Sequence, residues 1–172
     1  MSDAKRQLDD ELVALIDSHY LSVYRYGYRL TGSAADAEDI TQQTFLKVQS
    51  RMEQLRDKNS AKSWLFTIAR NIFLKSLRDN KIPPVSLDSV AEPFEETTLH
   101  LDFDSEALQS AINDLPEEYR SPLILYYFRE FSYKEIASQL DVPMGTVMSR
   151  LARAKSALRT RLTPNHSPAI DS

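Results

Sequence analysis

An acidic, proline-containing segment divides this chain into two parts. Residues 81–106 carry one basic residue against seven acidic ones, together with three prolines, and show no sustained helical period. This composition is typical of an exposed linker rather than of a core element. We therefore expect one unit at 1–80, a linker at 81–104, a second unit at 105–163 and a disordered tail at 164–172.

Apolar residues recur at helical spacing on both sides of the linker. In the first unit they run from Leu12 to Leu30 and predict one amphipathic helix that Gly32 ends. A second helix begins after Ser33, and a third covers about 60–79. No segment alternates apolar and polar residues as a half-buried strand does. The expected fold class is all-α, with two small helical domains.

The second unit is predicted to be helical in shorter steps. After one short helix, a second helix over 116–129 contains Pro122, which predicts a kink or a break. Ser132 and Glu135 have the spacing of a capping box for a third helix. A fourth helix runs over about 145–162. Two short helices joined by a tight turn, the second of them basic, are typical of a helix-turn-helix.

The composition excludes several classes of function. The chain has no Cys and three widely separated His, so it offers no thiolate nucleophile and no metal-ligand motif. Its three Gly argue against a phosphate-binding loop. The sequence shows no combination of general base, nucleophile and metal-ligand residues that would form a catalytic site. We therefore expect no enzyme, no cofactor, no metal and no small-molecule substrate.

The chain also lacks the sequence signals of a membrane or secreted protein. No apolar run approaches the roughly 18 to 20 residues of a membrane span. The polar N-terminus is not followed by an apolar signal segment. We therefore expect a cytoplasmic location without membrane insertion.

The net charge of −4, with a pI near 5.4, argues at first against a polyanionic partner. Without residues 81–106, however, the remainder carries 20 basic and 18 acidic residues, a net charge of +2. Residues 142–170 hold five basic residues and no acidic one. The acidity therefore belongs to the linker, and the last helix is locally basic.

The faces of the last helix match those of a DNA-reading helix. On a helical wheel Val147, Leu151 and Leu158 lie on one side and are expected to pack on the domain. Ser149 and Arg153 lie on the opposite side. Small side chains allow close approach to a major groove, an arginine can bind guanine with two hydrogen bonds, and flanking cations meet phosphates. The alternative is a solvated amphipathic helix with ordinary surface arginines.

The third helix carries a second candidate surface. Trp64, Thr67, Asn71, Lys75 and Arg78 form one stripe on the helical wheel. An aromatic ring, an amide and two cations can stack on unpaired bases and hold a nucleic-acid backbone. The alternative is half-buried packing of the tryptophan beside a solvated surface.

Several motifs together resemble extracytoplasmic-function sigma factors. Residues 37–47 (AEDITQQTFLK) resemble region two, and residues 63–71 (SWLFTIARN) resemble its adjoining promoter-melting segment. Residues 115–120 (LPEEYR), 131–137 (FSYKEIA) and 142–151 (VPMGTVMSRL) resemble region four. The resemblance covers about 8–79 and 105–162, in the order that the family has.

The resemblance implies an alternative sigma factor that binds core RNA polymerase and directs promoter-specific transcription initiation. It implies a polymerase-binding surface at Asp39, Gln42, Gln43 and Phe45. It implies that residues 55–62 capture a flipped base of the single-stranded minus-ten element. The residues expected to contact this element are Arg56, Lys58, Asn59, Lys62, Trp64, Thr67, Asn71, Lys75 and Arg78. It implies that the duplex minus-thirty-five element is bound by Thr146, Met148, Ser149, Arg150, Ala152, Arg153, Ser156 and Arg161.

The resemblance also implies an anti-sigma factor as a further partner. The acidic linker would thread toward the RNA-exit path of the polymerase, where it either mimics nucleic acid or serves as a plain solvated tether. The sequence departs from the family pattern at three positions. Gln43 stands where an acid is usual, so one charge contact to the polymerase is expected to be lost or replaced by a hydrogen bond. Met148 and Ala152 make the recognition face less basic, which favours contact with thymine methyl groups.

Two other functions are consistent with parts of the sequence. A sigma-like decoy would bind only a regulatory protein, but it would not need DNA-facing residues such as Asn71 and Arg153. A helix-turn-helix repressor would leave the stripe from Trp64 to Arg78 unexplained. Repressors also usually dimerise, and the chain has no long heptad segment for that.

Overall fold

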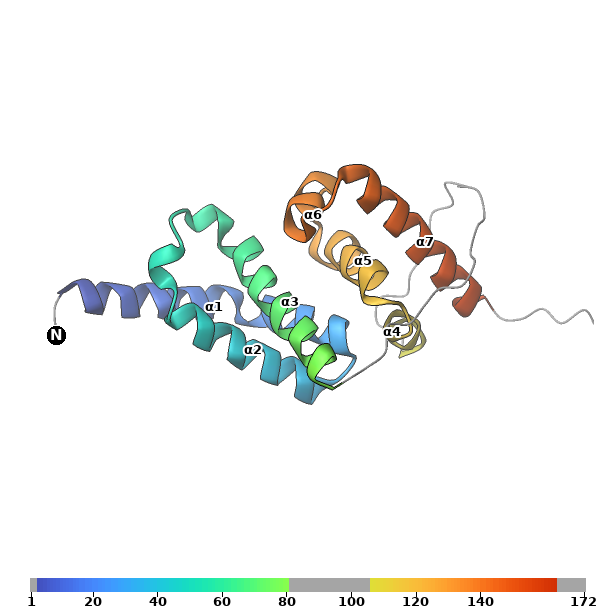
Figure 1. Ribbon diagram of the computed structural model, residues 1–172. Helices are drawn as coiled ribbons and strands as arrows, with labels where there is room; N and C mark the ends of the chain where they lie inside the picture. Colours follow the sequence, from blue (N-terminus) through green and yellow to red (C-terminus); the bar gives the residue numbers. More distant parts are fainter. Residues whose placement is uncertain (1–2, 81–105, 164–172) are drawn as a thin grey trace, which may run out of the picture.

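The computed structural model describes residues 3–80 and 106–163, and the regular elements in these ranges are all helices (Figure 1). The expected all-α fold class is therefore confirmed. The predicted linker at 81–104 and the predicted tail at 164–172 lie outside the described residues. In chain order the α-helices are α1 (Asp3–Thr31), α2 (Ala34–Gln49), α3 (Ala61–Asp79), α4 (Glu106–Asn113), α5 (Glu117–Arg129), α6 (Tyr133–Leu140) and α7 (Met144–Leu162), and two short 3₁₀ helices, Met52–Gln54 and Lys58–Ser60, join α2 to α3.

Helices α1, α2 and α3 pack on one another and form the N-terminal unit. Gly27 allows α2 to approach α1 closely, because a Cβ atom there would lie 3.4 Å from Ala37. Gly32 follows α1 with φ +69°, in the left-handed region that favours glycine at a helix end. The apolar face of α3, including Leu65 and Ile72, is buried in this unit.

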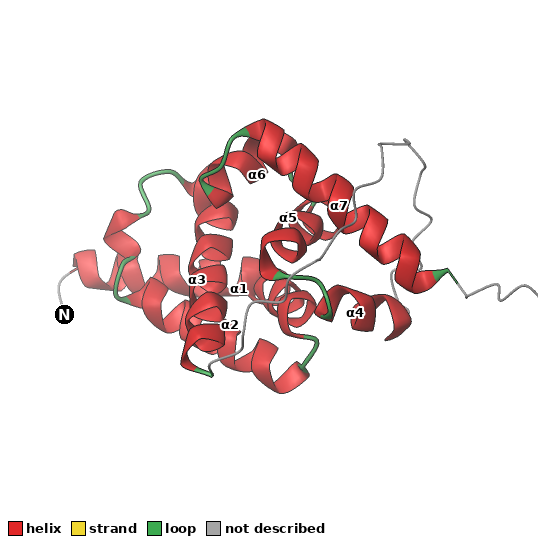
Figure 2. Ribbon diagram, turned by 45° about the vertical axis from the view of Figure 1, so that its right-hand side comes forward, coloured by secondary structure: helices red, strands yellow, loops and turns green. Residues whose placement is uncertain are grey.

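Helices α4 to α7 form the C-terminal unit, in which α6 and α7 are the helix-turn-helix pair (Figure 2). The predicted capping box is confirmed. The Ser132 hydroxyl accepts a hydrogen bond from the Glu135 amide at 3.2 Å, and the Glu135 carboxylate accepts one from the Ser132 amide at 2.7 Å. These hydrogen bonds lower the pKa of Glu135. The cap therefore fixes where α6 begins.

Of the kink or break predicted at Pro122, the break is contradicted. Helix α5 is not broken at Pro122, and it continues from Glu117 to Arg129. The proline lies in the second turn, where it removes one backbone hydrogen bond. Its side chain is buried beside those of Leu123 and Ile124, so burial of this apolar segment maintains the helix.

The two units are packed against each other and share one hydrophobic core (Figures 1 and 2). The C-terminal end of α1 contacts α4 and α5. The ring of Phe66 on α3 stacks on that of Phe131, at the turn between α5 and α6, with 5.8 Å between the centroids. Sequence periodicity predicts the helices but not this packing between units.

Removing the cap of α6 tests the local structure of the helix-turn-helix. We expect Ser132→Ala to lower the free energy of unfolding by about 1 kcal/mol, because the Glu135 amide loses its acceptor. Urea denaturation followed by circular dichroism measures the change. Ser138→Ala, in the exposed last turn of the same helix, is the matched control and should leave the value within about 0.5 kcal/mol. Equal loss in both variants would contradict the role of the cap.

Candidate nucleic-acid interface

The outer face of α7 is exposed along the stripe that the sequence predicts. Val147 and Leu151 are buried against the C-terminal unit, whereas Met148 is 47% exposed. Ser149 and Arg153 are also exposed. Four other predicted residues lie at the margin of this face and are partly buried: Thr146, Arg150, Ala152 and Ser156. The helix therefore presents small and apolar side chains beside Arg153.

Three arginines of α7 contact groups on α5 or in the turn that follows α4. Arg150 lies 4.0 Å from the carboxylate of Glu118, and Arg161 forms an ion pair with Asp114. Arg153 donates a hydrogen bond to the Tyr119 hydroxyl at 3.2 Å. Two of these three cations therefore have a carboxylate partner within the chain, and Arg153 has a neutral one. A phosphate must compete with Glu118 or Asp114, whereas no carboxylate is paired with Arg153 among the described residues.

The predicted stripe on α3 is present on the surface of the N-terminal unit. Asn71, Lys75 and Arg78 are exposed, and Trp64 and Thr67 are partly buried. The Thr67 hydroxyl donates to the Ser63 carbonyl at 2.9 Å, inside its own helix. The stripe therefore offers one amide, two cations and the accessible part of an indole ring on a single helix face.

Lys62 does not join this stripe. Its ammonium group lies 5.6 Å from the ring centroid of Phe131 and 6.0 Å from that of Phe66, on the side of α3 that meets the C-terminal unit. Lys62 therefore contributes to the contact between the units. Helical spacing places Lys62 two residues before Trp64, which turns the two side chains to different faces.

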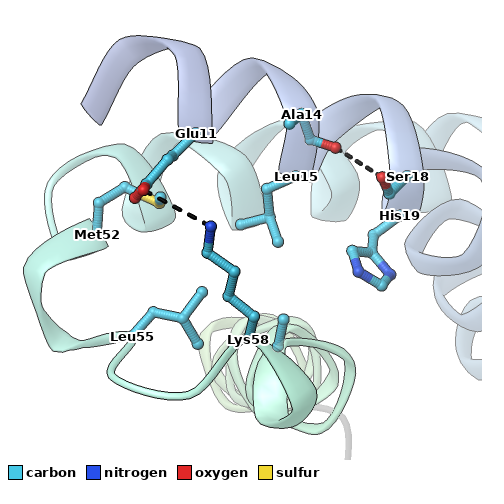
Figure 3. Close-up of a pocket in the computed structure, with 9 residues that line it drawn as sticks. Glu11, Ala14, Leu15, Ser18, His19, Met52, Leu55 and Lys58 are labelled. Carbon is cyan, nitrogen blue, oxygen red and sulfur yellow. Dashed lines mark hydrogen bonds and ion pairs between the residues drawn. The ribbon is translucent and has the colours of Figure 1, made fainter. Parts of the chain in front are cut away.

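The loop between α2 and α3 covers a cavity of about 230 Å³ (Figure 3). Lys58 reaches across the cavity to within 3.7 Å of the Glu11 carboxylate on α1. Asp57 accepts a hydrogen bond from the Asn59 amide at 2.9 Å, which shapes the loop. The Asn71 side chain is not among those that line the cavity. The structure thus brings Lys58 to α1, while Asn71 remains on the stripe of α3.

His19 also lines this cavity, and the sequence reading assigns it no role. Partial burial, with the positive charge of Lys62, lowers the pKa of His19. The imidazole is therefore mostly neutral at pH 7 and adds no cation to the loop region. Arg56 and Asn59 are exposed on the loop itself.

The predicted protein-binding residues on α2 divide into exposed and buried ones. Asp39, Gln42 and Gln43 are exposed, and Gln43 donates a hydrogen bond to the Asp39 carboxylate at 2.6 Å. Phe45 is only 8% exposed and stacks on Tyr20, with 6.0 Å between the ring centroids. The expectation of Phe45 as a surface residue is therefore wrong.

Leu46, which the sequence reading omits, is the exposed apolar residue here. Its side chain is 67% exposed and borders an open groove between α1 and α2. The groove is also lined by Leu12, Ile16, Tyr20, Gln42, Phe45 and Gln49. Leu46 follows Phe45 directly and lies outside the buried face of α2, which includes Ile40 and Val48.

The described part of the chain contains no group of His, Cys, Asp or Glu residues that could hold a metal ion. Among the described helices, none is long and apolar enough to cross a membrane.

Comparison with known proteins finds two family matches that follow the two units. Residues 15–82 match the sigma-70 region 2 family, and residues 105–158 match sigma-70, region 4. The chain is 36% identical over 154 residues to the ECF RNA polymerase sigma factor SigL of Mycobacterium tuberculosis, and the match covers 87% of each chain. It is 35% identical to SigE of Mycolicibacterium smegmatis, with 92% of this chain and 64% of that protein covered.

A solved structure is similar over both units. The sigma factor RpoE from Bartonella quintana, in co-crystals with the anti-sigma factor NepR, matches with a TM-score of 0.68 and 26% identity. The match covers 93% of this chain and 99% of the RpoE chain. The described helices of this chain therefore have the same overall fold as that sigma factor.

Proposed function

Because the chain belongs to the extracytoplasmic-function sigma factors of RNA polymerase, a family of initiation factors that are not enzymes, we propose which of its surfaces bind core polymerase and which bind the two promoter elements. The protein is an alternative sigma factor that binds core RNA polymerase and directs promoter-specific transcription. The observation that carries the assignment of surfaces is that two exposed helix faces bearing cations, one on α3 and one on α7, lie on two different units.

We propose that α7 reads the minus-thirty-five element in the major groove. Arg153 is the base-reading arginine, because it is exposed and its partner in the chain is a neutral hydroxyl. Met148 and Ala152 offer apolar contact to thymine methyl groups. Arg150 and Arg161 bind phosphates after exchanging their carboxylate partners. Thr146, Ser149 and Ser156 complete the polar contacts of this face.

The stripe on α3 is proposed to bind the melted minus-ten element. Trp64 stacks on an unpaired base, Asn71 hydrogen-bonds to a base edge, and Lys75 and Arg78 hold the backbone. Arg56, Lys58 and Asn59 are proposed to contact the same strand from the loop that precedes α3. Lys62 is exposed beside the contact between the units, and it is proposed to reach the same strand from there.

The exposed side of α2 is proposed to bind core polymerase. Asp39, Gln42 and Gln43 supply polar contacts, and Leu46 supplies the apolar one, with Phe45 as the buried floor beneath it. Exposed apolar side chains in a groove with a polar rim are typical of a protein-binding surface.

An anti-sigma factor is proposed as a further partner, because the similar RpoE chain was solved in complex with one. A cytoplasmic location is proposed because core RNA polymerase acts there.

Reconstituted transcription with core polymerase tests the function directly. Specific transcripts from a cognate promoter are expected, and their absence after removal of any inhibitor would refute it.

Replacing Arg153 tests the upstream assignment. We expect Arg153→Ala in the holoenzyme to reduce discrimination at one base pair of the minus-thirty-five element by about 1 to 3 kcal/mol. Binding to promoter fragments with each base pair changed in turn measures this. Arg6→Ala, an exposed arginine on α1, is the control for the loss of one charge. Uniform weakening on all fragments would instead identify a phosphate contact.

Replacing Asn71 tests the minus-ten assignment. We expect Asn71→Ala to slow promoter opening about tenfold or more, while core polymerase binding stays unchanged, because the exposed amide contacts only unpaired bases. Permanganate reactivity of unpaired thymines measures opening. Gln7→Ala, an exposed amide on α1, serves as the matched control. Equal losses of opening and of polymerase binding would show a structural role.

Replacing Leu46 tests the polymerase surface. We expect Leu46→Asp to weaken core polymerase binding at least tenfold, or about 1.4 kcal/mol, because it places a charge in the apolar contact. Leu21→Asp is the matched control, since Leu21 is 55% exposed and does not line the groove. Titration of labelled protein with core polymerase measures both. Similar affinities for the two variants would contradict the assignment.

A further inference from the structure

Tyr119, in the first turn of α5, is a buried side chain that faces the last helix. Its side chain is only 7% exposed, and Leu123, one turn further along α5, is fully buried. The Tyr119 amide donates a hydrogen bond to the Pro116 carbonyl at 3.0 Å, which closes the first turn of the helix. A buried aromatic ring is held by close packing around it, so the position of the Tyr119 hydroxyl is well defined.

The Arg153 side chain reaches this hydroxyl from the exposed face of α7. Its Nη1 group donates a hydrogen bond to the Tyr119 hydroxyl oxygen at 3.2 Å. The two residues are 34 positions apart in the sequence, and the packing of α7 on α5 brings them together. A long surface side chain, which is otherwise free to change rotamer, is therefore attached at its charged end to a fixed point in the domain.

This hydrogen bond leaves one edge of the guanidinium available. Arginine has five N–H donors in one plane, and it binds guanine through two neighbouring donors on one edge. With Nη1 directed toward Tyr119, the edge formed by Nε and Nη2 keeps both of its outward donors. Among the described residues, Tyr119 supplies the hydrogen bond that Arg153 makes within the chain. The Nε–Nη2 edge can therefore bind a base without breaking the bond to Tyr119.

The contrast with Arg150 shows why a neutral partner matters. Arg150, one turn before Arg153 on α7, lies 4.0 Å from the carboxylate of Glu118, the residue that precedes Tyr119 on α5. Hydrogen bonds to an ionised acceptor are roughly twice as strong as those to a neutral one, so a carboxylate competes with DNA more strongly than a hydroxyl does. Two neighbouring residues of α5 therefore give two neighbouring arginines of α7 different partners, one ionised and one neutral.

Orientation of the guanidinium affects base discrimination more than overall affinity. An arginine loses rotamer freedom when it binds, and a side chain that is already oriented loses less. A phosphate offers oxygen atoms in several directions, whereas the O6 and N7 atoms of guanine must be met in the plane of the base. A pre-oriented Arg153 therefore gains most at a G·C base pair and little at a phosphate.

We propose that Tyr119 is a specificity-determining positioning residue, whose hydroxyl holds Arg153 in the orientation that reads a guanine of the minus-thirty-five element. This inference rests on the proposed function, because it requires that Arg153 meets a base. It adds to that function a buried residue of α5 that acts on DNA only through Arg153.

Removing the hydroxyl alone tests the proposal. Tyr119→Phe keeps the ring and its packing but removes the acceptor of the Arg153 hydrogen bond. In the holoenzyme, we expect discrimination at the base pair that Arg153 reads to fall about three- to tenfold, the worth of one hydrogen bond. Promoter fragments with each base pair of the element changed in turn measure this. Tyr127→Phe, which removes a hydroxyl from a partly buried tyrosine of the same helix, is the matched control and should leave discrimination unchanged.

A double-mutant cycle separates positioning from a structural role. In an Arg153→Ala background, Tyr119→Phe should cause no further loss of discrimination, because no guanidinium remains to be positioned. Binding to DNA that lacks the element should be the same for Tyr119→Phe and wild type. Thermal unfolding followed by circular dichroism reports the stability of each variant. A merely structural role would lower the melting temperature and weaken binding to all fragments alike, in both backgrounds.

Three results would overturn the proposal. If Arg153→Ala loses discrimination and Tyr119→Phe does not, Tyr119 does not position the arginine, and the proposed function still stands. If Tyr119→Phe loses as much discrimination in the Arg153→Ala background as in wild type, Tyr119 acts by another route. If Arg153→Ala weakens binding to all fragments uniformly, the base-reading assignment in the proposed function fails, and the role of Tyr119 fails with it.

Discussion

Burial of the C-terminal half of α1 is the constraint on which the rest of the structure depends. Val23, Tyr26 and Leu30 are fully buried, and α2, α3, α4 and α5 all contact α1. Burial raises the pKa of Tyr26, so its hydroxyl stays neutral inside the core. Because α2 and α3 are positioned on this one helix, it sets the direction in which both the α2 surface and the α3 stripe face. Because α4 and α5 cover its end, it also joins the two units.

The electrostatic character of the protein follows from pairing as much as from composition. The acidic segment 81–106 gives the chain its net negative charge, yet the last helix is basic. In the folded chain Glu118 and Asp114 lie beside Arg150 and Arg161. On the proposed assignment, DNA binding exchanges these carboxylate partners for phosphates, which limits the gain from each contact. Such an arrangement fits a protein that relies on polymerase for tight promoter binding.

Sequence reasoning succeeded where a signal is local and failed where it depends on distant packing. The capping box at Ser132 and the helical end at Gly32 follow from neighbouring residues, and both are present. Pro122 was expected to kink or break α5, and the helix is not broken there, because burial of its apolar neighbours outweighs the local preference of proline. Phe45 and Leu46 are adjacent apolar residues, but Phe45 is buried and stacks on Tyr20 of another helix, whereas Leu46 is exposed.

The sequence by itself determined an all-α chain with two helical units, an acidic segment between them, and the stripes of α3 and α7 that are proposed to meet DNA. Helical period, caps and charge act within a few residues, so they can be read from neighbours in the chain. Only the tertiary structure decided that Arg70 meets Glu117 and that Arg120 completes α1. Those contacts join residues 47 and 90 positions apart, and no local rule specifies them, because they depend on how two apolar surfaces are buried together.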